Sequence, residues 1–100
     1  MFFYVYVLYS ERFNRLYIGY SSDLKKRFLQ HNQGKSKATK PFRPYQLIFY
    51  EAFTEESDAK AREVYLKSGW GRRSLKKMLP MWFLTHPQLK DSVLIDDENC

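Results

Sequence analysis

The segment from Phe2 to Tyr9, FFYVYVLY, is the feature that most constrains the fold. It consists almost entirely of aromatic and β-branched residues, the composition of a β-strand. Both of its alternating sets of side chains are apolar, so both faces of the strand have to be covered. The chain must therefore place other elements on both sides of this strand.

Turn and capping residues divide the following segment into short elements. Residues 16–20 form a second apolar run, which we expect to pair with the first as a hairpin. Ser21, Ser22 and Asp23 predict the start of a helix that runs to about Asn32 and stops at Gly34. Residues 33–44 read as a basic loop.

The second half continues with one strand and two helices. We expect a strand over residues 45–53, then a helix capped by Thr54, Glu55 and Glu56 that reaches about Lys67. A break over residues 68–71 and a short helix over residues 72–79 that ends at Pro80 should follow. The order β-β-α-β-α-α predicts an α+β fold, with a three-stranded antiparallel sheet flanked by helices on both faces.

Length and cysteine usage favour a single small domain. We expect residues 1–80 to form the domain and residues 81–100 a C-terminal extension with an apolar MWFL segment and an acidic tail. The one cysteine, Cys100, permits no intrachain disulfide, which fits the reducing cytoplasm. No segment approaches the roughly 20 apolar residues of a membrane span, and we expect no signal peptide.

Positive charge is concentrated in the body of the chain. All 17 basic residues but only seven of the 11 acidic ones lie in residues 1–90, which gives that part a formal charge of +10. Such a charge favours a polyanionic partner, with nucleic acid first and an anionic membrane surface second, although a merely soluble basic surface is the alternative.

Charged or ionisable residues are predicted at the edge of the buried face of both longer helices. Leu24, Arg27, Phe28 and His31 follow i, i+3, i+4, i+7 spacing and share one stripe. Glu63 lies on the corresponding stripe of the second helix. A buried charge is costly unless it is paired or binds a ligand, so the structural alternative is an Arg27–Glu63 bridge or snorkelling side chains.

These residue types suit phosphodiester chemistry if they gather with Tyr6 and Tyr17 over one face of the sheet. Arginine can hold a phosphate oxygen through two hydrogen bonds, and glutamate can anchor a hydrated divalent cation. Gly19 would leave room for a substrate backbone to come close.

The segments Tyr4-Val5-Tyr6 and Tyr17-Ile18-Gly19 resemble the paired signature of the GIY-YIG nuclease family. The second segment matches to the letter and the first is a variant, as in small stand-alone bacterial members. Arg27, His31 and Glu63 follow at fitting spacing, and the resemblance covers roughly residues 2–79.

The resemblance implies metal-dependent hydrolysis of DNA, with Mg²⁺ or Mn²⁺ as cofactor, by an endonuclease of repair or recombination. It implies that Tyr6 and Tyr17 activate or position water, with Tyr6 favoured as base. Arg27 would stabilise the phosphate, His31 would assist proton transfer or orient a tyrosine, and Glu63 would hold the metal. The chain departs from the family in lacking a late-domain asparagine, because the only one after Glu63 is Asn99.

Basic residues on either side of this site are candidates for holding DNA, with affinity that falls as salt rises. They are Lys35, Lys37, Lys40, Arg43, Lys67, Arg72, Arg73 and Lys76, next to the proposed approach at Gly19. Trp70 either stacks on an exposed base or, as we favour, covers the core. The sequence predicts no long helix that could read bases in the major groove. We therefore expect the protein to recognise branched or damaged DNA by its shape, or to depend on a targeting protein.

Two other functions fit parts of the same pattern. One is a nucleic-acid-binding module of this fold with weak or no catalysis, which would not need Glu63. The other is a protein-interaction adaptor, which would not need Arg27, His31 and Glu63 to coincide with two tyrosines. We expect no small-molecule cofactor.

Overall fold

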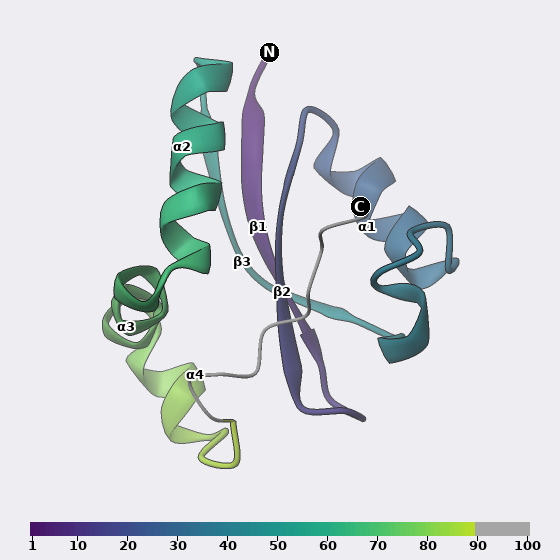
Figure 1. Cartoon of the computed structure of the whole chain (residues 1–100), viewed down its shortest axis with the longest axis vertical. Coiled ribbons are helices and arrows are strands. Elements are labelled where there is room, and N and C mark those ends of the chain that lie inside the picture. Colours follow the sequence, from purple (N-terminus) through teal and green to yellow (C-terminus); the bar gives the residue numbers. More distant parts are fainter. Residues whose placement is uncertain (90–100) are drawn as a thin grey trace.

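The computed structural model describes residues 1–89 and has the predicted three-layer arrangement. Figure 1 shows the sheet between α1 on one side and α2, α3 and α4 on the other. The elements are β1 Phe3–Ser10, β2 Arg15–Ser21, α1 Leu24–Asn32, a 3-10 turn Lys40–Phe42, β3 Gln46–Phe53, α2 Glu56–Lys67, α3 Gly69–Met78 and α4 Pro80–Leu84. The predicted fold class and element order are confirmed.

The first strand lies in the middle of the sheet, as its two apolar faces require. The strand order is β2-β1-β3, and β1 runs antiparallel to both neighbours. In the β1–β2 pairing Tyr6 lies opposite Gly19 and Leu8 opposite Tyr17, whereas Val7 lies opposite Ile18. Because side chains alternate along a strand, the tyrosines share one face and the Val7–Ile18 pair belongs to the other.

Each face of the sheet has its own core. The larger core, under α2–α4, contains Val5, Val7, Tyr9, Leu16, Ile18, Ala59, Leu66, Leu75 and Leu89. The smaller core, under α1, contains Tyr6, Leu8, Tyr17 and Tyr45, against which Leu24 and Phe28 pack. The helical stripe read from the sequence therefore does face the sheet.

The caps of α1 and α3 explain where these helices begin. Asp23 caps α1, and its carboxylate accepts a hydrogen bond from the Lys26 amide at 3.1 Å, so the capping group is an acid and not a serine hydroxyl. Ser68 caps α3, and its hydroxyl accepts from the Gly71 amide at 3.1 Å. The predicted break over residues 68–71 is thus wrong, because Ser68 alone interrupts the two helices.

The chain after α3 packs back on the larger core. Pro80 begins α4, and Trp82 and Phe83 contact the core while Leu89 is buried in it. The acidic tail lies outside the described residues. Within residues 1–89, no helix combines the length and the apolar character that crossing a bilayer requires.

Candidate active site on the α1 face

A hydrogen bond between Tyr6 and His31 lies at the centre of the α1 face. The Tyr6 hydroxyl oxygen is 2.8 Å from Nε2 of His31, and neither side chain has any solvent-exposed surface. Strand β1 supplies the phenol and the last turn of α1 supplies the imidazole. The other imidazole nitrogen, Nδ1, lies 2.8 Å from the hydroxyl oxygen of Thr39.

His31 is a neutral imidazole at neutral pH. Burial, helped by the positive charge of Arg27, lowers the pKa of His31 from 6.5 to about 4. A neutral imidazole carries one N–H and one free acceptor nitrogen. The imidazole can therefore accept a hydrogen bond from only one of its two neighbours, Tyr6 or Thr39, and donates one to the other.

Tyr17 and Arg27 complete the group that the structure brings together. The ring of Tyr17 is 4.9 Å from that of His31 and 6.3 Å from that of Tyr6, measured between centroids. Arg27 is half-buried one turn before His31, and its guanidinium donates a 3.4 Å hydrogen bond to Gln30. The α1 face thus gathers two phenols, an imidazole and a guanidinium.

Gly19 contributes to this group by lacking a side chain. A Cβ atom there would overlap the hydroxyl of Tyr6 and the ring of Tyr17. The space expected to admit a substrate backbone is thus filled by the phenol of Tyr6. Gly19 is buried, so its assignment to DNA contact is corrected to one of admitting Tyr6.

Glu63 lies in the other layer of the molecule. Helix α2 packs Ala59 and Leu66 on the Val5–Ile18 face of the sheet, opposite to the face that carries the two phenols. The negative charge of Glu63 acts on Tyr20 of β2, on that same side, whose pKa is raised to about 12 chiefly by a hydrogen bond to Glu56. The expectation that all five residues converge over one face is therefore wrong for Glu63.

The Glu63 carboxylate has a partner already. Lys67 donates a 3.0 Å hydrogen bond to it, one turn along α2, in place of the Arg27–Glu63 bridge considered above. Within residues 1–89, no three His, Cys, Asp or Glu side chains form a metal-binding group. A single carboxylate can hold a Mg²⁺ or Mn²⁺ ion that keeps most of its waters, provided that Lys67 releases the Glu63 carboxylate.

The predicted DNA-binding residues fall into two groups on opposite sides of the sheet. Lys35, Lys37 and Lys40 are exposed in the loop after α1, whereas Arg73 and Lys76 are exposed on α3. Figure 1 shows this loop and α3 on opposite sides of the strands. A duplex that touches both groups has to pass around an edge of the sheet.

Three of the other basic residues have structural contacts. Arg43 fills the space beside Gly34, which adopts a positive φ of 78°. Lys67 pairs with Glu63, and Arg72 donates to the Lys67 carbonyl oxygen at 3.3 Å. Their assignment to DNA binding therefore competes with contacts inside the protein.

Trp70 is exposed and does not cover the core. Its side chain is 71% exposed, and the guanidinium carbon of Arg73 lies 4.7 Å from its ring centroid. The inward face of α3 is made by Gly71 and Leu75, four residues apart, which turns Trp70 outward. The favoured packing role of Trp70 is thus wrong, and the stacking role stays open.

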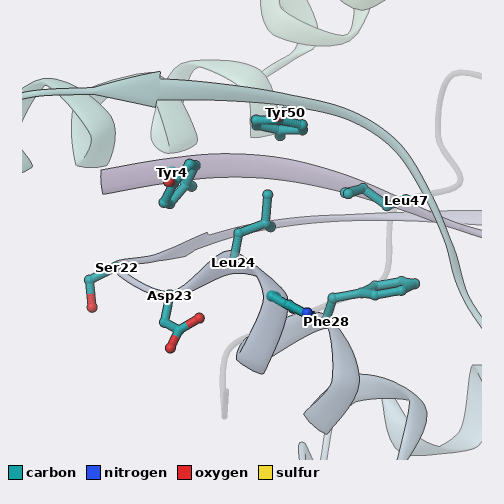
Figure 2. A pocket seen from close by; sticks show the side chains of 8 residues that line it. Tyr4, Ser22, Asp23, Leu24, Phe28, Leu47 and Tyr50 are labelled. Atoms are coloured by element: carbon teal, nitrogen blue, oxygen red, sulfur yellow. The ribbon is translucent and has the colours of Figure 1, made fainter. Parts of the chain in front are cut away.

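An open groove of about 440 Å³ lies on the same face of the sheet as Tyr6. Figure 2 shows Tyr4 and Tyr50 from the strands across from Leu24 and Phe28 of α1, with Ser22 and Asp23 at one end. No sequence pattern predicted this groove. The structure marks it by Tyr50, an aromatic side chain of strand β3 that is 52% exposed.

Comparison with known proteins identifies the fold family. A model of the GIY-YIG catalytic domain matches residues 2–76, which include the whole group on the α1 face. This chain belongs to the GIY-YIG family. It is thus a member of a nuclease family, and no solved structure gives a significant match to it.

The curated relatives of this GIY-YIG protein are small bacterial proteins. The chain is 42% identical over 62 residues to a UPF0213 protein of Staphylococcus saprophyticus, an alignment that covers 61% of this chain and 76% of the relative. It is 39% identical over 77 residues to a UPF0213 protein of Pediococcus acidilactici, covering 74% and 78%. With UPF0213 protein YazA of Bacillus subtilis it shares 47% over 55 residues, covering 54% and 56%.

Proposed function

We propose that this GIY-YIG protein is a divalent-metal-dependent DNA endonuclease that acts in repair or recombination. The observation that carries the proposal is the Tyr6–His31 hydrogen bond, formed over Gly19 in a member of a nuclease family. A phenol that can pass its proton to an imidazole is able to take one from water, which is general base catalysis.

Each residue on the α1 face has a role in this scheme. Tyr6 accepts a proton from the attacking water as its own phenolic proton moves to Nε2 of His31, and Tyr17 positions that water. Because the pKa of His31 is about 4 in the protein alone, this transfer requires the negative charge of the bound phosphate to raise that pKa. The resulting hydroxide attacks phosphorus, and the bond from phosphorus to the 3′ oxygen breaks. Arg27 stabilises the negative charge that develops on the phosphate oxygens.

Two features set conditions on the scheme. Tyr6 has no exposed surface, so DNA binding has to open the α1 face before water reaches it. A hydrated Mg²⁺ or Mn²⁺ ion held by Glu63 would stabilise the 3′ leaving oxygen. Because Glu63 lies beyond the sheet from Tyr6, the DNA strand has to meet the two groups around the β2 edge.

The existing partners of Tyr6 and Glu63 favour a second candidate, a DNA-binding domain without cleavage. A buried Tyr6–His31 pair and a Glu63–Lys67 ion pair are both complete without substrate. In such a domain they would stabilise the fold and leave binding to the exposed lysines.

A nicking assay separates the two candidates. Supercoiled and branched DNA are incubated with Mg²⁺ or Mn²⁺ and with wild type, Tyr6→Phe, Arg27→Ala or Glu63→Gln. The nuclease proposal expects each substitution to lower the rate by about 10²-fold or more, the scale of one acid–base or electrostatic contributor. Glu56→Gln, two turns earlier on α2, is the matched control and should keep full activity.

The outcomes are distinct. Binding at low salt without nicking under any metal condition supports the binding domain. Nicking that persists at the wild-type rate in Glu63→Gln removes the metal role of that residue. A protein that binds no DNA at low salt contradicts both candidates.

A further inference from the structure

Thr39 is a buried loop residue that no sequence pattern singled out. It lies between α1 and β3, has no exposed surface, and places its hydroxyl oxygen 2.8 Å from Nδ1 of His31. Its backbone carbonyl accepts a 2.6 Å hydrogen bond from the hydroxyl of Tyr45. The Thr39 side chain therefore contacts the imidazole, while Tyr45 bonds the Thr39 backbone.

The hydrogen bonds around His31 can run in one of two directions. If Thr39 donates to Nδ1, the imidazole proton lies on Nε2 and points at Tyr6. If Nδ1 donates to Thr39, then Nε2 is a bare acceptor for the Tyr6 hydroxyl. The neighbour beyond Thr39 distinguishes these cases.

That neighbour is the backbone carbonyl of Ser36, which can only accept. The Thr39 hydroxyl lies 3.5 Å from the Ser36 carbonyl oxygen, a long contact but one that gives its proton a place to go. In one direction, the Tyr6 hydroxyl donates to Nε2, Nδ1–H donates to Thr39, and the Thr39 hydroxyl donates to this carbonyl. Every donor in this series of hydrogen bonds then has an acceptor. In the reverse direction the Ser36 carbonyl oxygen keeps its 2.9 Å hydrogen bond from the Lys40 amide, but the bond from Thr39 is lost, so Tyr6, His31, Thr39 and Ser36 make one hydrogen bond fewer among themselves.

We propose that Thr39 is a positioning residue, which accepts the Nδ1 proton of His31 and so keeps Nε2 free to receive the proton of Tyr6. The claim that His31 carries its proton on Nδ1 is independent of function, whereas the claim that Nε2 receives the proton of Tyr6 rests on the proposed nuclease function. Without the hydroxyl, an Nδ1–H donor would be buried and unpaired, so the proton should move to Nε2 and turn the imidazole from acceptor to donor toward Tyr6.

The groups that face His31 are few. Arg27 lies on the same helix, and Tyr6 and Tyr17 come from the sheet. Tyr45, the residue before β3, has its ring centroid 6.2 Å away. Among the described side chains around His31, Thr39 is the one that bonds Nδ1. The choice of tautomer therefore depends on Thr39.

Long-range ¹H–¹⁵N NMR of the imidazole nitrogens tests the proposal in the full chain. The protein has two histidines, so the His86→Gln variant assigns the His31 signals. Wild type should show a protonated Nδ1 and a free Nε2 at pH 7. Thr39→Val, which keeps the shape but loses the hydroxyl, should move the proton to Nε2, and Thr39→Ser should restore the wild-type signals.

Two results would overturn the proposal. One is a wild-type spectrum with the proton on Nε2, which decides the matter even if Thr39→Val does not fold. The other is a folded Thr39→Val variant that keeps the proton on Nδ1.

The nicking assay then tests the catalytic consequence separately. Thr39→Val should lower the nicking rate about 10²-fold with unchanged DNA affinity, because a histidine in the wrong tautomer cannot take the proton. Thr39→Ser should recover most of that rate. If the NMR result holds and no protein nicks DNA, the nuclease function fails and the positioning role of Thr39 stands.

Discussion

The hydroxyl of Tyr6 occupies the space that a side chain on Gly19 would fill. The two residues face each other across the β1–β2 pair, so the glycine of the family signature admits the tyrosine of the preceding strand. The two halves of the signature thus form one packing unit, in which Gly19 of β2 leaves space for the side chain of Tyr6 of β1.

Gly19→Ala should displace Tyr6 and break its bond to His31. Overpacking at such a site costs about 1–3 kcal/mol, which urea unfolding measures directly. Gly69→Ala is the control, because nothing lies within 4 Å of a Cβ at that helical position. That control should be neutral or slightly stabilising, and equal losses in both variants would contradict the packing unit.

Acidification should weaken the fold through His31. Its pKa is about 4 in the folded protein and about 6.5 when unfolded, so the unfolded chain binds more protons between these values and stability falls as pH falls. At pH 5 the loss relative to pH 7 should be about 2 kcal/mol. The His31→Gln variant, compared with wild type at both pH values, isolates this contribution from those of the carboxylates, and an identical pH dependence in both proteins would refute it.

Lys67→Met should free Glu63 for a cation. The ion pair is only partly exposed and lies within one helix, where such pairs contribute at most about 1 kcal/mol, so Mn²⁺ should bind up to about fivefold more tightly. An EPR titration of free Mn²⁺ measures this. Lys60→Met, which removes the equivalent 3.6 Å pair with Glu56 on the same helix, should leave the affinity unchanged.

Trp70→Ala should reduce DNA affinity without affecting the fold. An exposed side chain away from special features changes stability by no more than about 0.5 kcal/mol, whereas loss of one stacked base costs about 1–3 kcal/mol. Fluorescence anisotropy with a single-stranded oligonucleotide at low salt compares this variant with Met81→Ala, a similarly exposed apolar residue. Equal affinities for both variants and wild type would assign Trp70 no part in binding.

The sequence was sufficient where local pattern and global packing coincide. The two apolar faces of Phe2–Tyr9 predicted a central strand covered on both sides, and the spacing of Leu24, Phe28 and His31 predicted which face of α1 is buried. Both depend only on the periods of strand and helix.

Other features depended on contacts between distant segments. Helical spacing placed Glu63 on the inner side of α2, but spacing does not say on which side of the sheet a helix packs. Gly71 looked like a helix breaker, yet it lies inside α3 because its missing side chain lets the helix approach the backbone of Leu66. Thr39 was hidden in a loop whose path toward His31 no periodicity describes.

The sheet that separates Tyr6 from Glu63 also separates their energetics. Because the hydrogen bond of Tyr6 goes to His31 and the ion pair of Glu63 goes to Lys67, on opposite faces of the sheet, the stability changes caused by Tyr6→Phe and Glu63→Gln should add, within about 0.5 kcal/mol. If a double-mutant cycle then finds that the effects of the two substitutions on the cleavage rate do not add, we infer that the bound DNA couples the two residues.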